Sequence, residues 1–401
     1  MDKRVLNNGL TIVSKQMDSP IVCLQVTVKT GSDQESLENN GIAHFVEHML
    51  FEGTEKRDGA RAISNEIEAI GGDINAYTSN QRTCYYIKVP REHFMLALNL
   101  LSDLVMQSVF PDKYLEKERK VILKEINLHR DEPRSHQWVL FQRALFGTHA
   151  AGRATYGTVK AVSGMSREDL FAFYEQHYVA ESMIVSVAGG FPGDAIKRIE
   201  HAFGGCRESA VSGFPKSSFP VYTHLNEKRK MNNSYFVMGY RTVARGDQDS
   251  YVFDVIRSIL GRGQSGAIFE EIRNKRGLAY EVGVHHDALK EYGYLAIYLN
   301  THKKHFDTCL SVIFAEFKKL ESLSQEELDD AKGFLMGQYV LDQEDTQSIA
   351  DGLAFWEMVK DARLADEYLK HISHVTLKDI ARVAKKFFTR DYAMATIEQR
   401  E

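Results

Sequence analysis

The chain has 401 residues, of which 43% are hydrophobic and 26% are charged, with a formal net charge of −5 at pH 7. This length exceeds that of one ordinary hydrophobic core and predicts at least two domains. The basic residues are scattered along the chain, which argues against nucleic acid as a partner. No run of 18 apolar residues occurs, so we expect no transmembrane helix and no membrane partner.

The first residues, Met-Asp-Lys-Arg-Val-Leu-Asn-Asn-Gly, turn polar at once. They lack the apolar core of a signal peptide and the Ser/Arg bias of a transit peptide. The four cysteines, Cys23, Cys84, Cys206 and Cys309, are far apart and form no C-x-x-C pair. Three of them lie in strand-like or helix-like apolar runs, where a buried structural thiol is expected. These features favour a cytoplasmic protein, with the mitochondrial matrix as the alternative.

Hydrophobic periodicity predicts an α+β pattern in the first half of the chain. Strands are expected at 10–15, 22–29, 74–79, 83–89 and 183–188, the third and fourth as a hairpin. Helices are expected at 41–51, 60–70, 93–106, 112–129, 138–146 and 166–174. In the second half, we expect a helix at 251–260 and another that starts at Ala267, ends at Gly277 and leads into a strand.

Residues 205–222 contain Gly, Ser and Pro with little periodicity and are typical of a linker. They divide the chain into predicted domains at 1–204 and 223–401. Two helix starts recur at similar offsets: the one after Pro111 recurs 213 residues later at Ser324, and the one at Ser166 recurs 210 residues later at Thr376. The chain is therefore predicted to contain two homologous mixed α/β domains, each a sheet covered by helices, from an internal duplication.

Residues 41–54 contain the spacing H-x-x-E-H at His44, Glu47 and His48. On a helix, the two histidines lie one turn apart on one face, and Glu47 projects to the same side. The apolar neighbours would bury this helix almost all round, so two His and one Glu need a partner there. Two satisfied core histidines are the ordinary alternative, but a metal is the simplest partner, since two such imidazoles can bind one Zn²⁺.

Two histidines leave a zinc site short of protein ligands, because catalytic sites usually supply three, with water as the fourth ligand. The expected helix at 112–129 offers Glu116, Glu118 and Glu125. Glu118 and Glu125 are two turns apart and share one face, whereas Glu116 is expected on the surface. Glu125 differs from an ordinary surface acid because it lies within an apolar run.

Together, these residues resemble the pitrilysin and mitochondrial-processing-peptidase family of zinc peptidases, the inverzincins, as a short two-domain member of bacterial type. In that family, H-x-x-E-H is followed about seventy to eighty residues later by a ligand Glu; here Glu125 follows His48 by 77 residues. The resemblance implies that His44, His48 and Glu125 bind one Zn²⁺ per chain. It also implies that Glu47 is the general base and that Glu118 supports the site.

The resemblance extends to the stretch Gly71-Gly72-Asp-Ile-Asn-Ala-Tyr-Thr-Ser, which in the family is the strand that pairs with the substrate backbone. It implies substrate contacts at Asn75, Ala76, Tyr77 and Thr78. From the residues alone, Arg273 is a surface side chain and Tyr280 a half-buried strand residue. In the family, an Arg and a Tyr seven residues apart in the second half reach the substrate, so the resemblance implies that Arg273 and Tyr280 bind or polarise the peptide carbonyl.

Residues 261–266 match G-x-G-x-x-G, which in another context would indicate a dinucleotide site. That motif requires a preceding strand, whereas a helix is expected here, so we do not expect a nucleotide cofactor. The adjacent His285 and His286 are not expected to bind a metal, because neighbouring strand residues point to opposite faces.

The resemblance implies a zinc metalloendopeptidase, a hydrolase that cuts unfolded peptides or presequence-like segments. The alternative is a catalytically silent or partner-dependent core subunit of a processing-peptidase-type complex. Silent subunits generally lose part of the zinc set, which this chain keeps. Family chains of about this length commonly pair, and this chain carries both the zinc set and the Arg/Tyr pair. We therefore expect a homodimer, with a heterodimer as the alternative.

Overall fold

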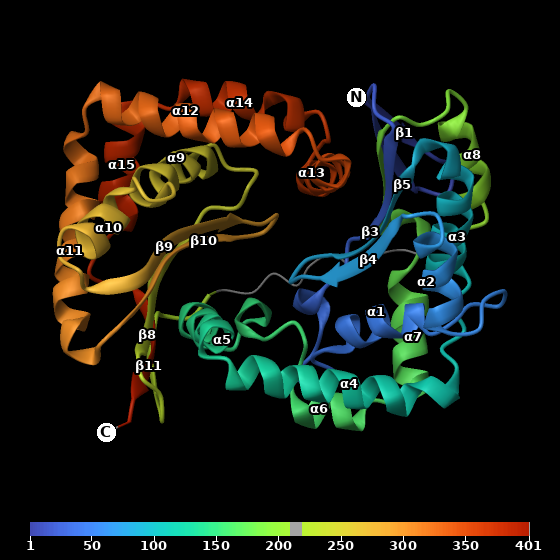
Figure 1. Ribbon diagram of the computed structural model, residues 1–401, viewed down its shortest axis with the longest axis horizontal. Helices are drawn as coiled ribbons and strands as arrows, with labels where there is room; N and C mark the ends of the chain where they lie inside the picture. The colour runs from blue at the N-terminus through green and yellow to red at the C-terminus, as the bar shows by residue number, and fades with distance from the viewer. Residues whose placement is uncertain (209–218, 401) are drawn as a thin grey trace. The chain divides into compact units, whose positions relative to one another are not determined.

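The computed structural model describes residues 1–208 and 219–400, which form two compact units (Figure 1). Among these residues, unit 1 contains 1–128, 153–208 and 342–365, and unit 2 contains 129–152, 219–341 and 366–400. Each unit is a mixed α/β sheet with helices, as predicted. The division departs from the contiguous domains predicted at 1–204 and 223–401, and residues 209–218 of the predicted linker lie outside the described residues.

The sheet of unit 1 contains β1 (Asp2–Val5), β2 (Thr11–Gln16), β3 (Ile21–Val28), β4 (Asp73–Thr78), β5 (Thr83–Pro90) and β6 (Met183–Gly189). Their order is β1-β2-β6-β3-β5-β4. The pair β2 and β6 is parallel, and the other neighbours are antiparallel. The predicted hairpin is the pair β4 and β5.

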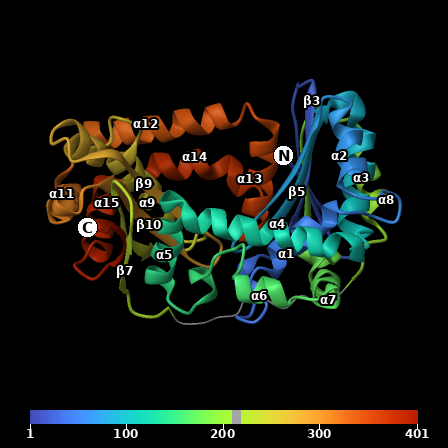
Figure 2. The same ribbon diagram turned by 60° about the horizontal axis from the view of Figure 1, so that its bottom comes forward.

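Helices cover both faces of this sheet (Figure 1 and Figure 2). One face packs against α1 (Ile42–Phe51), α2 (Ala60–Glu68), α3 (Phe94–Met106), α7 (Arg167–His177) and α8 (Ala195–Phe203), and the other against α13 (Thr346–Val359). Side chains alternate accordingly: Leu24 joins the core under α1 and α3, whereas Cys23 packs with Leu353 of α13. The unit also contains α6 (Val159–Gly164) and most of α4 (Asp112–Asp131).

The sheet of unit 2 contains β7 (His224–Arg229), β8 (Ser234–Thr242), β9 (Ala279–Ala288), β10 (Gly293–Thr301) and β11 (Ala393–Gln399). Their order is β7-β11-β8-β10-β9, with β7 and β11 parallel and the other neighbours antiparallel. One face is covered by α5 (Pro133–Phe146), whose Phe141 packs with Val237 and Ala296. The remaining helices are α9 (Asp249–Gly261), α10 (Ala267–Phe269), α11 (Phe306–Lys319), α12 (Gln325–Asp342), α14 (Leu364–His374) and α15 (Leu377–Phe387).

The structure corrects one prediction about a helix and confirms another. Helix α5 begins at Pro133, not near residue 138 as predicted, because the Glu132 side chain accepts a hydrogen bond from the Arg134 amide and proline fits the first helical position. The G-x-G-x-x-G match starts at Gly261, the last residue of α9, so a helix occupies the place where a dinucleotide site needs a strand.

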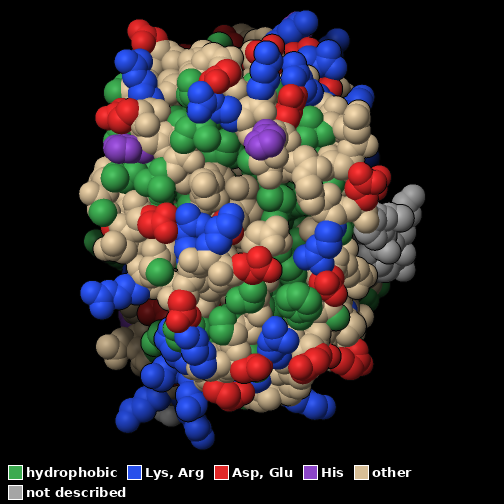
Figure 3. Space-filling view, turned by 90° about the vertical axis from the view of Figure 1, so that its right-hand side faces the viewer, with side chains coloured by type: hydrophobic (Ala, Val, Ile, Leu, Met, Phe, Trp, Pro, Cys, Tyr) green, Lys and Arg blue, Asp and Glu red, His purple; other side chains and the backbone are tan. Residues whose placement is uncertain are grey.

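The surface over α2, α3 and α8 mixes basic and acidic side chains with apolar ones (Figure 3). All four cysteines are buried and free, including the three for which burial was expected. Within residues 1–208 and 219–400, no helix combines the length and the apolar character that a membrane span needs.

Candidate metal centre

Helix α1 presents two imidazoles on one face. It starts after Gly41, whose φ of 97° lies in the left-handed region that glycine adopts without strain. The rings of His44 and His48 have centroids 4.7 Å apart and planes inclined by 78°. Their side chains keep 12% and 20% exposure, while the apolar side chains around them are buried. One stripe of an otherwise buried helix is therefore accessible.

Glu125 of α4 faces both imidazoles. Its Oε2 atom lies 3.7 Å from His44 Nε2 and 3.8 Å from His48 Nε2. The side chain is 34% exposed, so the group lies at an open surface of unit 1. The structure thus brings together the three residues that the sequence singled out as the metal set.

The three side chains fit a zinc ion. One ligand atom from each lies within 4.8 Å of the others, and within the described part of the chain this is the one such group of three or more His, Cys, Asp or Glu residues. Two imidazoles and a carboxylate form a donor set typical of catalytic zinc. Ligands bound at about 2.1 Å in a tetrahedron lie about 3.4 Å apart, so the two distances from Glu125 Oε2, 3.7 Å to His44 Nε2 and 3.8 Å to His48 Nε2, would shorten by a few tenths of an ångström.

Glu118, also on α4, contacts His48 from the other side. Its Oε2 lies 3.1 Å from His48 Nδ1. Burial raises the pKa of Glu118, but hydrogen bonds from His48 and Lys117 outweigh burial and lower the pKa to about 2. An ionised Glu118 accepts the Nδ1–H of His48, which leaves Nε2 of that ring toward Glu125. The contact fixes both the tautomer and the orientation of the ring.

Glu47 projects toward the edge strand β4. The Thr78 hydroxyl donates a hydrogen bond to Glu47 Oε2. Burial raises the pKa of Glu47, and the hydrogen bond from Thr78 and the charge of His48 oppose this increase. A carboxylate with a raised pKa beside a candidate metal set is suited to accept and release a proton.

Strand β4 carries the residues predicted to contact substrate, Asn75, Ala76, Tyr77 and Thr78. In the strand order of unit 1, β4 comes last, beside β5. Thr78 faces α1, while the Tyr77 hydroxyl donates to Asp351 of α13. Arg82 Nη2 donates to the same carboxylate at 2.8 Å. The β4–β5 hairpin is therefore tied to a helix on each face.

Arg273 and Tyr280 belong to unit 2. Arg273 lies in a π-helical turn that follows α10, and Tyr280 lies on β9. The Arg273 guanidinium carbon is 4.7 Å from the centroid of the Tyr280 ring, which is 75% exposed. The two side chains predicted to act together thus lie against each other.

Sequence reasoning missed two buried acids next to α1. Glu52 at its C-terminal end accepts a hydrogen bond from Lys117 at 2.9 Å, and Lys117 also lies 3.1 Å from Glu118. Glu35, before the N-terminal end, accepts hydrogen bonds from the start of α1. Acids in loops and at helix ends are usually solvated, so the sequence offered little signal for either residue.

Comparisons with known proteins identify the family. A model of the insulinase family (peptidase family M16) matches residues 11–159, and a model of the peptidase M16 inactive domain matches residues 164–335. A Bacillus subtilis protein named "Uncharacterized zinc protease YmxG" is 31% identical over 98% of this chain and 95% of its own length. The chain belongs to peptidase family M16. This confirms the resemblance inferred from H-x-x-E-H and Glu125.

Further relatives of this M16 protein agree. A zinc protease of Rickettsia felis is 30% identical over 96% of this chain and 94% of its own length. A solved protease from Helicobacter pylori has a TM-score of 0.92 at 20% identity, covering 99% of each chain. A Pseudomonas fluorescens structure described as a peptidase M16 inactive domain has a TM-score of 0.91 at 19% identity, covering 100% of this chain and 98% of that one. The two structures share the fold, and the names of the relatives point to zinc.

Proposed function

We propose that this M16 protein is a zinc-dependent endopeptidase that hydrolyses unfolded peptides or presequence-like segments. The observation that carries the proposal is the approach of His44, His48 and Glu125 around one point, with Glu47 beside them. The family membership and the names of the relatives support zinc and peptide hydrolysis.

In this proposal, His44 Nε2, His48 Nε2 and the Glu125 carboxylate hold the zinc ion. Glu118 keeps His48 in the tautomer that leaves Nε2 for the metal. When bound, zinc lowers the pKa of a water molecule toward neutrality and polarises a substrate carbonyl. The remaining steps belong to side chains of the protein.

Glu47 is proposed as the general base. Its carboxylate accepts a proton from the attacking water at Oε1 or Oε2 and then delivers that proton to the leaving amine. The raised pKa supports this role, because the protonated form must persist long enough to donate. The Thr78 hydroxyl holds the carboxylate beside β4.

Strand β4 is proposed to take the substrate as an added strand along Asn75–Thr78. Backbone pairing requires an extended peptide, so compact folded proteins are expected to be poor substrates. Arg273 and Tyr280 are proposed to contact the peptide carbonyl, on the strength of the family resemblance and of their mutual contact.

The test compares Glu47→Gln with His48→Ala in the full-length chain. Glu47→Gln is expected to keep one zinc per chain while lowering the cleavage of a quenched unstructured peptide by a factor on the order of 10² or more. His48→Ala is expected to lose zinc and activity together. Chelation should abolish wild-type activity, and one equivalent of zinc should restore it. Turnover of the Gln variant close to that of wild type would rule out Glu47 as the base.

The same assay addresses the alternative of a silent core subunit. One zinc per wild-type chain, with no cleavage in a diverse peptide library read by mass spectrometry, would favour that alternative. Cuts that disappear in Glu47→Gln would favour the peptidase.

A further inference from the structure

Glu35 is a buried acid in the loop that leads into α1. Its residue is 5% exposed, and its carboxylate accepts three hydrogen bonds. The Oε2 atom accepts from Asn40 Nδ2 at 2.8 Å and from the Gly41 amide at 2.7 Å. The Oε1 atom accepts from the Ala43 amide at 3.0 Å. The last of these donors belongs to the residue directly before His44.

These bonds replace an ordinary helix cap. The first amides of a helix have no partner within the helix, and a Ser, Thr, Asp or Asn side chain at the N-cap usually accepts from one of them. The N-cap of α1 is Gly41, which has no such side chain. Glu35 supplies the acceptor from six residues upstream, and its oxygens lie at the amide end of the helix.

The loop that contains Glu35 is fastened to a second segment of unit 1. Arg153 Nη1 donates to the Glu35 backbone carbonyl at 2.7 Å, and Asn40 Nδ2 also donates to the Ala154 carbonyl at 3.2 Å. A Cβ atom on Gly41 would lie 2.7 Å from the Gly157 Cα, so the two backbones touch. The start of α1 is therefore held by a small polar assembly centred on Glu35.

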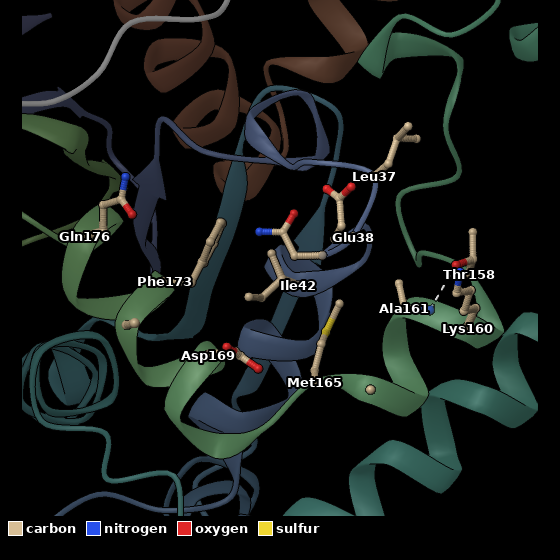
Figure 4. A pocket seen from close by; sticks show the side chains of 13 residues that line it. Leu37, Glu38, Ile42, Thr158, Lys160, Ala161, Met165, Asp169, Phe173 and Gln176 are labelled. Atoms are coloured by element: carbon tan, nitrogen blue, oxygen red, sulfur yellow. Dashed lines mark hydrogen bonds between the residues drawn. The ribbon is translucent and has the colours of Figure 1, made fainter.

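The outer side of this loop faces a cavity of about 590 Å³ (Figure 4). Leu37, Glu38 and Ile42 line it from the loop and the first residue of α1, opposite Met165 and Phe173 (Figure 4). The loop therefore borders an open pocket, while the Glu35 side chain within it is buried.

Burial raises the pKa of Glu35 to about 8, and the amides of Gly41 and Ala43, the Asn40 amide group and the charge of Arg153 oppose this increase. Each of the three contacts comes from an N–H donor, so both oxygens of the Glu35 carboxyl group serve as acceptors.

We propose that Glu35 is a positioning residue for the metal centre: it fixes the first turn of α1 and thereby the positions of His44 and His48 relative to Glu125. The inference rests on the proposed function, because it assumes that these three residues bind zinc. Glu35 acts through the backbone of Gly41 and Ala43, whose amides donate to its carboxyl oxygens.

The test is the zinc affinity of the full-length Glu35→Gln variant, measured by competition with a chromophoric chelator at a temperature where circular dichroism shows a folded chain. Glutamine keeps the size of the side chain but places an amide donor against amide donors. Partners that orient metal ligands typically contribute a factor of about 10–100 to metal affinity, and we expect a loss in that range.

The matched control is Asp103→Asn, which alters another buried carboxylate of unit 1. Asp103 accepts from Thr54 at 2.6 Å and from Arg57, and its residue is 3% exposed. This variant should lower the melting temperature but leave zinc affinity within twofold of wild type. A purely structural role for Glu35 would make both variants behave alike.

Each possible result either supports or overturns the role proposed for Glu35. Zinc affinity of Glu35→Gln equal to that of wild type would overturn the inference alone, and so would an equal loss in Asp103→Asn. A wild-type chain that binds no zinc would overturn the proposed function and this inference with it. If Glu35→Gln does not fold, Asn40→Ala decides: a loss of threefold or more supports the inference, and an unchanged affinity overturns it.

Discussion

The two units share an arrangement of five strands, to which unit 1 adds β1, but they differ in the chemistry of the helix that follows the central strand. The order β2-β6-β3-β5-β4 in unit 1 matches β7-β11-β8-β10-β9 in unit 2, each with one parallel pair followed by antiparallel neighbours. Helix α1 follows β3, and α9 follows β8. Equivalent helices therefore carry two of the three residues of the metal set in unit 1 and none in unit 2, as expected after duplication.

In unit 2, the acid on this helix is neutralised by the protein. Asp254 of α9 accepts from Arg245 Nη1 at 2.6 Å and from Tyr368 at 3.1 Å, and it lies 2.8 Å from His286 Nδ1 on β9. Burial raises the pKa of Asp254, but the charge of Arg245 and the bond with His286 outweigh it and hold the pKa well below its usual range. The cluster is complete without a metal.

In unit 1, three carboxylates, Glu47, Glu118 and Glu125, surround two imidazoles. Lys117 contacts Glu118 from outside the group. Charges that leave water need compensation, and a cation bound by His44, His48 and Glu125 would supply it. The same strand and helix arrangement therefore supports a closed ion-pair cluster in unit 2 and an open candidate metal site in unit 1, depending on where the positive charge comes from.

The largest expected effect comes from breaking the closed cluster with Asp254→Asn. Removing one partner of a buried ion pair typically costs about 3–5 kcal/mol, because the other charge stays buried. We expect unit 2 to lose stability by about that amount, while zinc affinity stays unchanged.

The two tryptophans of the chain allow each unit to be followed separately, because Trp138 belongs to unit 2 and Trp356 to unit 1. Urea unfolding in a Trp356→Phe background reports on unit 2, and in a Trp138→Phe background it reports on unit 1. The prediction is contradicted if Asp254→Asn shifts the Trp356 transition as much as the Trp138 transition, or if it weakens zinc binding.

An intermediate effect is expected in acid, from a buried histidine of unit 1. Burial lowers the pKa of His177 to about 4, and its Nδ1 lies 3.2 Å from the Thr30 hydroxyl. The unfolded state, with a pKa of about 6.5, binds a proton more readily, so stability is present above pH 6.5 and is lost as the pH falls toward 4.

Between pH 7.5 and pH 5, the loss amounts to about 2 kcal/mol for a single group with these pKa values. In the Trp138→Phe background, we expect the Trp356 unfolding transition to show this extra loss when His177 is present and to lack it in His177→Asn, whatever the absolute stability of the variant. Identical pH slopes in the two proteins would contradict a neutral buried His177.

The local parts of the site could be predicted from the sequence, because they depend on spacing along one helix. His44, Glu47 and His48 lie on α1 as expected, and Glu125 joins them from α4. The opposed directions of His285 and His286 also followed from strand geometry: His285 contacts Trp138, and His286 contacts Asp254.

The exchange of two helices between the halves of the sequence could not be predicted. Helix α5 lies in the first half but covers the sheet of unit 2, and α13 lies in the second half but covers the sheet of unit 1. Periodicity says which face of a helix is buried but not which sheet buries it. Asp351 of α13, which binds Tyr77 and Arg82, was missed for the same reason.

The smallest expected effect comes from the contact between the edge strand of a sheet and the helix beside it. In unit 1, Thr78 of β4 donates to Glu47 of α1, and in unit 2, His286 of β9 contacts Asp254 of α9. Thr78→Val keeps the shape of the side chain but removes the hydroxyl that orients Glu47. A net hydrogen bond is worth about 1 kcal/mol, so kcat is expected to fall by roughly fivefold, with KM and zinc content unchanged. Thr78→Ser, which keeps the hydroxyl, should retain most of the activity.

Two results would contradict this role of Thr78. A rise in KM of Thr78→Val without a fall in kcat would mean that Thr78 serves the substrate strand and not the base. An equal loss of kcat in Thr78→Val and Thr78→Ser would assign the effect to packing.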